Sequence, residues 1–123
     1  MGDVRSFRDL IAWQRGMELA EFVYAQSKSL PRHEQYGLCS QLRRAAVSVP
    51  SNIAEGWGRG ESADYTRFLI IARGSAHEVS TQAELACRLK FEGRWKMAIE
   101  KSDECGRILN GLIRAIRARR ERS

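Results

Sequence analysis

Few side chains in this sequence have the types and spacing that catalysis or metal binding requires. Two histidines occur, His33 and His77, and neither belongs to a His-Glu-x-x-His or Glu-x-x-His pattern, the ligand patterns of zinc proteases and di-iron bundles. The cysteines Cys39, Cys87 and Cys105 form no Cys-x-x-Cys pair, so neither a zinc ribbon nor a redox pair is indicated. A Cys39–His33 nucleophile pair would lack a local signature. We therefore expect a protein that is not an enzyme and that needs no metal or other cofactor.

Arginine is the residue type in this chain that is best suited to ligand binding. The 123 residues include 21 lysines and arginines against 15 acidic residues, a net charge of +6, which favours anionic partners and nucleic acid above all. Arginine binds phosphate with two parallel hydrogen bonds and stacks on bases. The candidate nucleic-acid contacts are Arg43, Arg44, Arg59, Arg67, Arg73, Arg114, Arg117, Arg119 and Arg120. Two alternatives stay open: a basic protein that is merely soluble, and a C-terminal run that is only a solvated helix end whose cations suit the helix dipole.

A second group of polar side chains could meet inside the protein, where the second and third expected helices cross. Its members are Ser48, Asn52, Glu55, Ser75 and Glu78. A fully hydrogen-bonded network of buried polar groups fixes the register of a core, so we expect a structural network here, with an arginine as the partner of the glutamates. The alternative is a ligand site, or a small enzyme that uses Asn52, Glu55 and Glu78, which would need a carboxylate of perturbed pKa in an open pocket.

Apolar residues at spacings of three and four predict four helices. Leu38, Leu42, Ala45 and Val49 show this spacing in the second of them. The expected helices span residues 9–27, 31–55, 63–91 and 94–119. Short connections favour antiparallel neighbours, and a low share of proline and aromatic residues argues against a β-sandwich. The sequence thus predicts an all-α, antiparallel up-down-up-down four-helix bundle that forms a single domain over residues 1–123.

Local signals define the course of the second helix. Pro50 lacks a backbone donor and its ring crowds the carbonyl group four residues earlier, so we expect the helix to be kinked there. Three glycines within residues 56–60 favour a loop after Glu55. Trp57 continues the apolar face and is expected in the core, although beside Arg59 it could instead offer a stacking ring to nucleic acid.

The chain has more apolar surface than one bundle needs. The first helix has a stripe formed by Leu10, Trp13, Met17, Ala20 and Tyr24, and further apolar residues lie outside it. Residues 68–71 are apolar around a full turn, and the small residues 74–76 would let another backbone approach. Because a helix that is apolar on more than one face is covered from more than one side, we expect self-association.

The sequence shows no pattern typical of secretion or of membrane insertion. We find neither a charged-then-apolar leader nor an apolar run of about 18 residues, so secretion and membrane insertion are not indicated. Free cysteines at wide spacing fit a reducing compartment. We therefore expect a cytoplasmic protein that does not engage a membrane.

The central segment resembles a known family. Residues 41–46 read Gln-Leu-Arg-Arg-Ala-Ala, and residues 48–56 read Ser-Val-Pro-Ser-Asn-Ile-Ala-Glu-Gly. With residues 7–10 before this segment and residues 67–69 after it, the chain resembles, over roughly residues 7–112, the bacterial four-helix-bundle proteins encoded by intervening sequences of 23S ribosomal RNA genes. Relatives of these proteins are accessory proteins of diversity-generating retroelements. The resemblance implies a four-helix bundle, a homopentamer, basic surfaces that engage nucleic acid, and a protein partner such as a reverse transcriptase.

Taken together, these features lead us to expect a non-catalytic oligomeric helical bundle that binds RNA or DNA through a basic surface. The alternative is an oligomeric protein-interaction scaffold with no nucleic-acid role. The salt dependence of nucleic-acid affinity distinguishes the two, because binding by phosphate contacts weakens steeply with salt.

Overall fold

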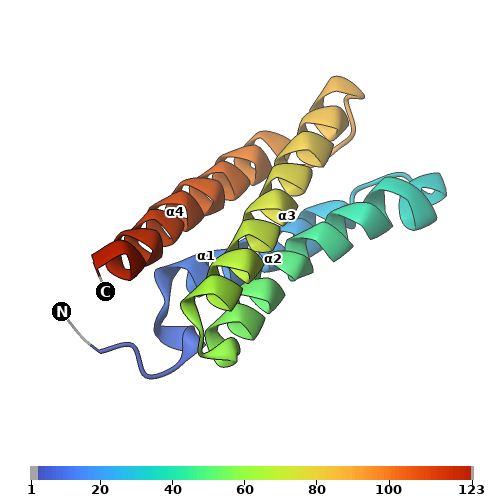
Figure 1. Ribbon diagram of the computed structural model, residues 1–123. Coiled ribbons are helices and arrows are strands. Elements are labelled where there is room, and N and C mark those ends of the chain that lie inside the picture. Colours follow the sequence, from blue (N-terminus) through green and yellow to red (C-terminus); the bar gives the residue numbers. More distant parts are fainter. Residues whose placement is uncertain (1–2, 123) are drawn as a thin grey trace.

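The computed structural model describes residues 3–122, and within them the chain forms four α-helices and no strand. The helices are α1 (Ile11–Ser27), α2 (Ser40–Arg59), α3 (Ser62–Arg88) and α4 (Trp95–Arg122) (Figure 1). α3 packs against both α2 and α4, and α1 packs against the same two helices from the other side. The prediction of an all-α four-helix bundle is therefore confirmed. None of the described helices is long and apolar enough to cross a bilayer.

Small side chains line the contacts between the helices. Alanines are buried at Ala45, Ala46, Ala72, Ala76, Ala83, Ala86 and Ala98. Around them lie fully buried larger residues such as Leu42, Leu69 and Leu109. A helix pair that meets through alanine brings its backbones close, so neighbouring large side chains interdigitate at the sides of the contact.

The face of α1 that packs inward differs from the predicted stripe. Leu19 and Val23 are fully buried, whereas Met17 is 38% exposed and Tyr24 43% exposed. Gly16 explains the difference, because a Cβ atom there would lie 3.1 Å from Cγ1 of Val49. α1 therefore approaches α2 closely through a residue without a side chain, and the apolar stripe read from the larger residues is turned partly toward solvent.

The start of the second helical segment is irregular. Regular helix was expected from residue 31, but the chain forms a 3₁₀ turn (Arg32–Glu34) and a π-helical turn (Gln35–Cys39) before α2 begins. Gly37 has non-helical angles (φ −109°, ψ −110°), and the Glu34 side chain accepts a hydrogen bond of 3.0 Å from the backbone N–H of Leu38. This cap replaces an intrahelical partner where the backbone departs from helix.

α2 continues past the residues that were expected to end it. The helix is unbroken at Pro50, where the Asn52 side chain donates to the Ser48 carbonyl group at 2.8 Å. The predicted loop after Glu55 is wrong, because α2 extends to Arg59 and ends at Gly60, whose φ of 83° is left-handed. Gly56 and Gly58 therefore lie within a helix rather than a loop.

The other predicted ends are close to the observed ones. α1 begins at residue 11 after a 3₁₀ turn (Phe7–Asp9), and α3 ends at residue 88 rather than 91. The early end of α3 follows from Lys90, whose φ of 59° is left-handed and cannot continue a helix. α4 extends to Arg122, three residues beyond the predicted end.

The two glycines within the last turns of α2 give opposite predictions. A Cβ atom on Gly56 would lie 2.8 Å from Cβ of Phe68 and 3.1 Å from Cδ1 of Tyr65, whereas one on Gly58 would meet nothing within 4 Å. Gly56→Ala should lower the free energy of unfolding by about 1–3 kcal/mol, because α2 and α3 would be pushed apart. Gly58→Ala should raise it by up to about 1 kcal/mol through helix propensity. Urea titrations followed by circular dichroism compare the two, and equal effects of the same sign would contradict the packing described here.

Candidate nucleic-acid interface

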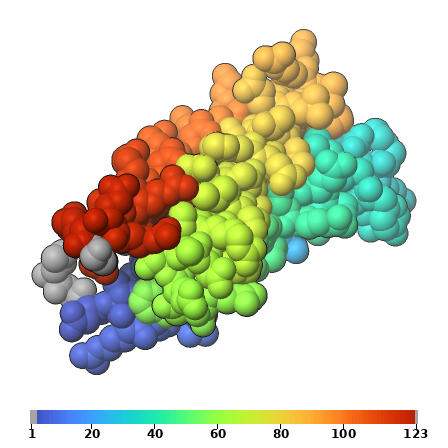
Figure 2. All heavy atoms as spheres, in the orientation of Figure 1, coloured from blue at the N-terminus to red at the C-terminus, as the bar shows by residue number. Residues whose placement is uncertain are grey.

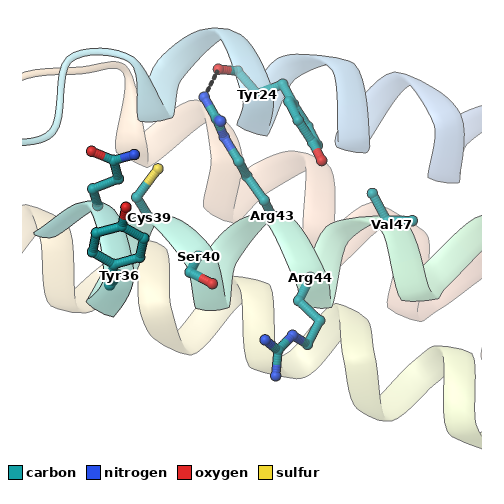
Figure 3. A pocket seen from close by; sticks show the side chains of 8 residues that line it. Tyr24, Tyr36, Cys39, Ser40, Arg43, Arg44 and Val47 are labelled. Carbon is teal, nitrogen blue, oxygen red and sulfur yellow. Dashed lines mark hydrogen bonds between the residues drawn. The ribbon is translucent and has the colours of Figure 1, made fainter.

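The predicted arginines separate into those engaged within the chain and those that are not. Arg43 belongs to the first class. Its Nε donates to Ser27 Oγ at 2.7 Å, its Nη2 donates to the Tyr24 carbonyl group at 3.3 Å, and its guanidinium lies 4.6 Å from the centre of the Tyr24 ring (Figure 3). Arg43 therefore joins α2 to the C-terminal end of α1, where carbonyl groups lack helical partners.

Arg59 and Arg67 both contact one aromatic ring. Their guanidinium groups lie 4.9 Å and 4.5 Å from the centre of the Phe68 ring. Each also pairs with a carboxylate on its own helix, Arg59 with Glu55 at 3.0 Å and Arg67 with Asp64 at 3.6 Å. Much of the positive charge on this surface is therefore balanced locally.

Arg73 links two helices. Its Nη1 donates to Asn110 Oδ1 at 2.9 Å, and the side chain is half-buried between α3 and α4. This arginine satisfies a polar group at the helix contact. It is less available to phosphate than an exposed arginine would be.

The remaining arginines of the predicted set are exposed. The side chains of Arg44, Arg114, Arg117 and Arg120 make no hydrogen bond, ion pair or ring contact with any other residue in the range 3–122. Arg119 is also exposed but interacts within the chain. A further exposed arginine, Arg122, was not in the predicted set.

The arginines at the end of α4 project past the core. Ile113 is the last buried residue of this helix, and Ile116 is only partly buried. Figure 2 shows the end of α4 (red) on the surface at one end of the molecule, far from the connection between α1 and α2 (cyan). We define the C-terminal arginines as Arg114, Arg117, Arg119, Arg120 and Arg122. Glu121 is the one carboxylate among residues 114–122.

The structure joins three of the five residues in the predicted polar network. The hydroxyl groups of Ser48 and Ser75 are 2.8 Å apart, and the Asn52 amide donates to Ser48 Oγ at 2.8 Å. Glu55 and Glu78 are exposed and lie outside this network. The prediction for the two glutamates is wrong, because α2 stays helical and turns Glu55 toward Arg59, while Glu78 lies on the outer face of α3.

Trp57 is partly buried rather than fully in the core. Its ring meets that of Tyr65 edge to face, with centroids 6.1 Å apart. A hollow of about 350 Å³ beside the pair is also lined by Glu61 and Arg119. The Tyr65 hydroxyl group is buried without a hydrogen-bond partner among the described residues, and burial raises the pKa of Tyr65 to about 12. Trp57 is thus held by its neighbours and does not stand free as a stacking ring.

No hydrogen bond joins the histidines and cysteines that were considered for catalysis, among the residues that the structure describes. His33 is exposed beside Glu34 at 3.7 Å, and His77 is exposed on α3. Cys39 and Cys105 are buried free thiols. Burial, reinforced by the nearby Glu104 carboxylate, raises the pKa of Cys105 to about 11, so this thiol stays protonated at neutral pH. No three His, Cys, Asp or Glu side chains gather as metal ligands within residues 3–122.

Comparison with known proteins identifies the family. A sequence model of the 23S rRNA-intervening sequence protein family matches residues 8–111. The chain belongs to this family. A solved structure with the same fold is a protein of unknown function from the S23 ribosomal protein family of Bacteroides thetaiotaomicron, with a TM-score of 0.76 and 25% sequence identity over 84% of this chain and 98% of that one. A search of curated proteins gave no match. The resemblance seen in the sequence is confirmed.

An exposed aromatic side chain, that of Tyr36, was not predicted from the sequence. Tyr36 is 91% exposed, more than any other large hydrophobic residue of the described chain. It lies in the π-helical turn before α2, where the spacing of apolar residues does not follow a regular helix. Its position next to Gly37, inside the predicted second helix, was the available signal, because glycine disfavours regular helix.

The corrected polar network predicts which substitutions reduce stability. Ser75→Ala should lower the free energy of unfolding by about 1–2 kcal/mol, because it leaves the part-buried Ser48 hydroxyl group with one partner fewer. Glu55→Ala should change it by less than about 0.5 kcal/mol, because only an exposed ion pair is lost. Chemical denaturation of both variants measures the difference. A larger loss for Glu55→Ala than for Ser75→Ala would restore the five-residue network.

Proposed function

We propose that this protein is a non-catalytic, self-associating bundle that binds RNA or DNA through the C-terminal arginines. The observation that carries the proposal is the set of exposed arginines on the outer part of α4, of which Arg114, Arg117 and Arg120 have no partner among residues 3–122. Arginine that is not engaged by a carboxylate keeps its donors for phosphate. Such contacts position a nucleic acid without reading its sequence.

The helix dipole does not account for all of the C-terminal arginines, because only Arg119, Arg120 and Arg122 lie in the last turn of α4. Cations are favoured near the C-terminus of a helix, but the effect is confined to about the last turn. Arg114 and Arg117 lie well before Arg122, the last residue of α4. Their exposure therefore favours a ligand over a purely local role. The family points the same way, since its description refers to an intervening sequence of ribosomal RNA.

Self-association belongs to the same proposal. Ile71, Leu85 and Leu89 are 42%, 46% and 51% exposed. Their spacings of fourteen and four residues place Ile71 and Leu85 on one face of α3 and Leu89 directly after its last residue, in line with them. We call these residues the α3 strip. Gly74 lies near it, exposed and with open space around its Cα atom, so another chain could approach closely there.

Assembly would strengthen a weak basic site. The homopentamer implied by the resemblance would carry five times +6, or +30, and repeated sites on one particle raise overall affinity by avidity. A reverse transcriptase as protein partner and a cytoplasmic location are further parts of this proposal, both taken from the resemblance and the composition. The scaffold alternative shares the assembly but lacks the nucleic-acid contact.

Replacing Arg114, Arg117, Arg119 and Arg120 together by alanine should weaken nucleic-acid binding by at least about tenfold, because several phosphate contacts are lost. The helix content should be unchanged, since these residues lie outside the core. The matched control replaces Arg15, Arg59, Arg67 and Arg88, which are paired with carboxylates, and removes the same number of charges. Fluorescence anisotropy with a labelled RNA compares the two variants.

An equal loss of nucleic-acid affinity in both variants would show that affinity depends on net charge and not on the position of the arginines. Binding by the first variant as strong as that of the parent would reduce the C-terminal arginines to a solvated helix end. No binding by the parent protein at low salt would favour the scaffold alternative.

The α3 strip predicts the outcome of a second experiment. Leu85→Asp combined with Leu89→Asp should convert the assembly to monomer, because charged side chains cannot be buried in an apolar contact without large cost. Ala115→Asp with Ala118→Asp, at exposed positions of α4, adds the same charge away from the strip and should leave the mass unchanged. Light scattering on a sizing column gives the mass. A parent protein that is monomeric at micromolar concentration would contradict the proposal.

A further inference from the structure

Two hollows adjoin at the connection between α1 and α2. The first has a volume of about 480 Å³ and is lined by Tyr24, Tyr36, Arg43 and Arg44 among others. The second has about 320 Å³ and adds Lys28 and Arg32. Both are lined by Gln35, Cys39 and Arg43, so they share a wall. We call this surface the α1–α2 groove.

The α1–α2 groove concentrates positive charge. Four cationic side chains line it, namely Lys28, Arg32, Arg43 and Arg44, and none of its lining residues is an aspartate or glutamate. Other hollows of the described chain differ, because Glu84 lies beside Arg88 in one and Glu61 lies near Arg119 in another. A concave surface lined by one sign of charge focuses the electric field and attracts counter-charged ligands.

Arg43 and Arg44 take different roles in this groove. Arg43 is held by Ser27 and by the carbonyl group of Tyr24, so its charge is fixed in place. Arg44 is exposed and has no partner among the described residues. Figure 3 shows Arg43 directed toward α1 and Arg44 directed away from it on the opposite side of α2. One arginine therefore supplies a fixed positive field and the other keeps all its donors for a ligand.

Tyr36 adds a flat apolar surface to this positive field. Its side chain is 91% exposed and makes no ring contact or hydrogen bond with residues 3–122. The turn that carries it is fixed by the bond from Leu38 N–H to Glu34. In Figure 3 the ring lies beside Cys39. A ring on a fixed backbone can stack on a planar ligand at small entropic cost.

An exposed aromatic ring beside unpaired cations matches one class of ligand. Single-stranded nucleic acid offers base faces for stacking and phosphates for the cations, and proteins that bind it combine these two contacts. In a duplex the base faces are already stacked on each other, so a ring on the protein surface gains nothing from them.

We propose that the α1–α2 groove binds an unpaired nucleotide segment, with a base stacked on Tyr36 and its phosphates held by Arg44, Lys28 and Arg32. The inference rests on the proposed function, since it names the form of nucleic acid and a second place where it is bound. The groove and the C-terminal arginines lie at opposite ends of the bundle (Figure 1), so the two contacts can be altered separately.

Binding of one labelled RNA, as a single strand and as a duplex with its complement, tests this proposal. Tyr36→Ala should weaken binding of the single strand by roughly five- to 150-fold, because one stacked base is lost. It should leave duplex binding and the salt dependence unchanged. Tyr36→Phe is the matched control and should bind as the parent does, because stacking needs the ring and not the hydroxyl group. Arg44→Ala should flatten the salt dependence for the single strand by about one phosphate contact.

Each other outcome has a definite meaning. If Tyr36→Ala binds the single strand as the parent does while the C-terminal arginine variant does not, the groove is not a binding site and the proposed function stands. If Tyr36→Ala changes the mass on a sizing column, the groove is a contact between proteins and this inference is overturned. If the parent protein binds neither probe at low salt, the proposed function fails and the groove proposal fails with it.

Discussion

Close approach of α2 to both of its neighbours is the constraint on which the rest of this structure depends. Gly16 of α1 faces Val49 and Pro50, and Gly56 of α2 faces Tyr65 and Phe68 of α3, each at distances that leave no room for a Cβ atom without movement. Helices that meet through such residues are fixed in separation and rotation. The rotation decides which other side chains face inward and which are left on the surface.

The residues that this packing leaves exposed are the ones that indicate function. Because α1 meets α2 through Gly16, Met17 and Tyr24 are partly exposed, and because α3 turns its small residues inward, Ile71, Leu85 and Leu89 face outward. Exposed apolar residues on a folded surface often mark contacts with other molecules. α4 shows the same division along its length, with a buried face up to Ile113 and arginines beyond it.

The number and type of the helices could be predicted from sequence because spacing of apolar residues reports helical faces directly. The end of α2 could not, because glycine at residue 56 favours a loop by local preference, whereas the close packing of α2 on α3 leaves no room there for a side chain. The candidate arginines could be chosen as a group from the charge of the sequence, and their role in nucleic-acid binding stays a prediction. Which of them are engaged depends on partners far along the chain, such as Asn110 for Arg73, and no local pattern reveals such pairs. Tyr36 was missed for a similar reason, since its exposure follows from an irregular turn rather than from a repeat.

The salt dependence of duplex binding by the unmodified protein tests the central claim most directly, because a duplex isolates the phosphate contacts attributed to the C-terminal arginines. If about six or more phosphates are neutralised by the assembly, the logarithm of the association constant should fall linearly with the logarithm of salt concentration. The affinity should then drop by roughly a thousandfold or more between about 50 and 200 mM salt. An affinity that stays constant over this range, or no binding at its lower end, would contradict the account.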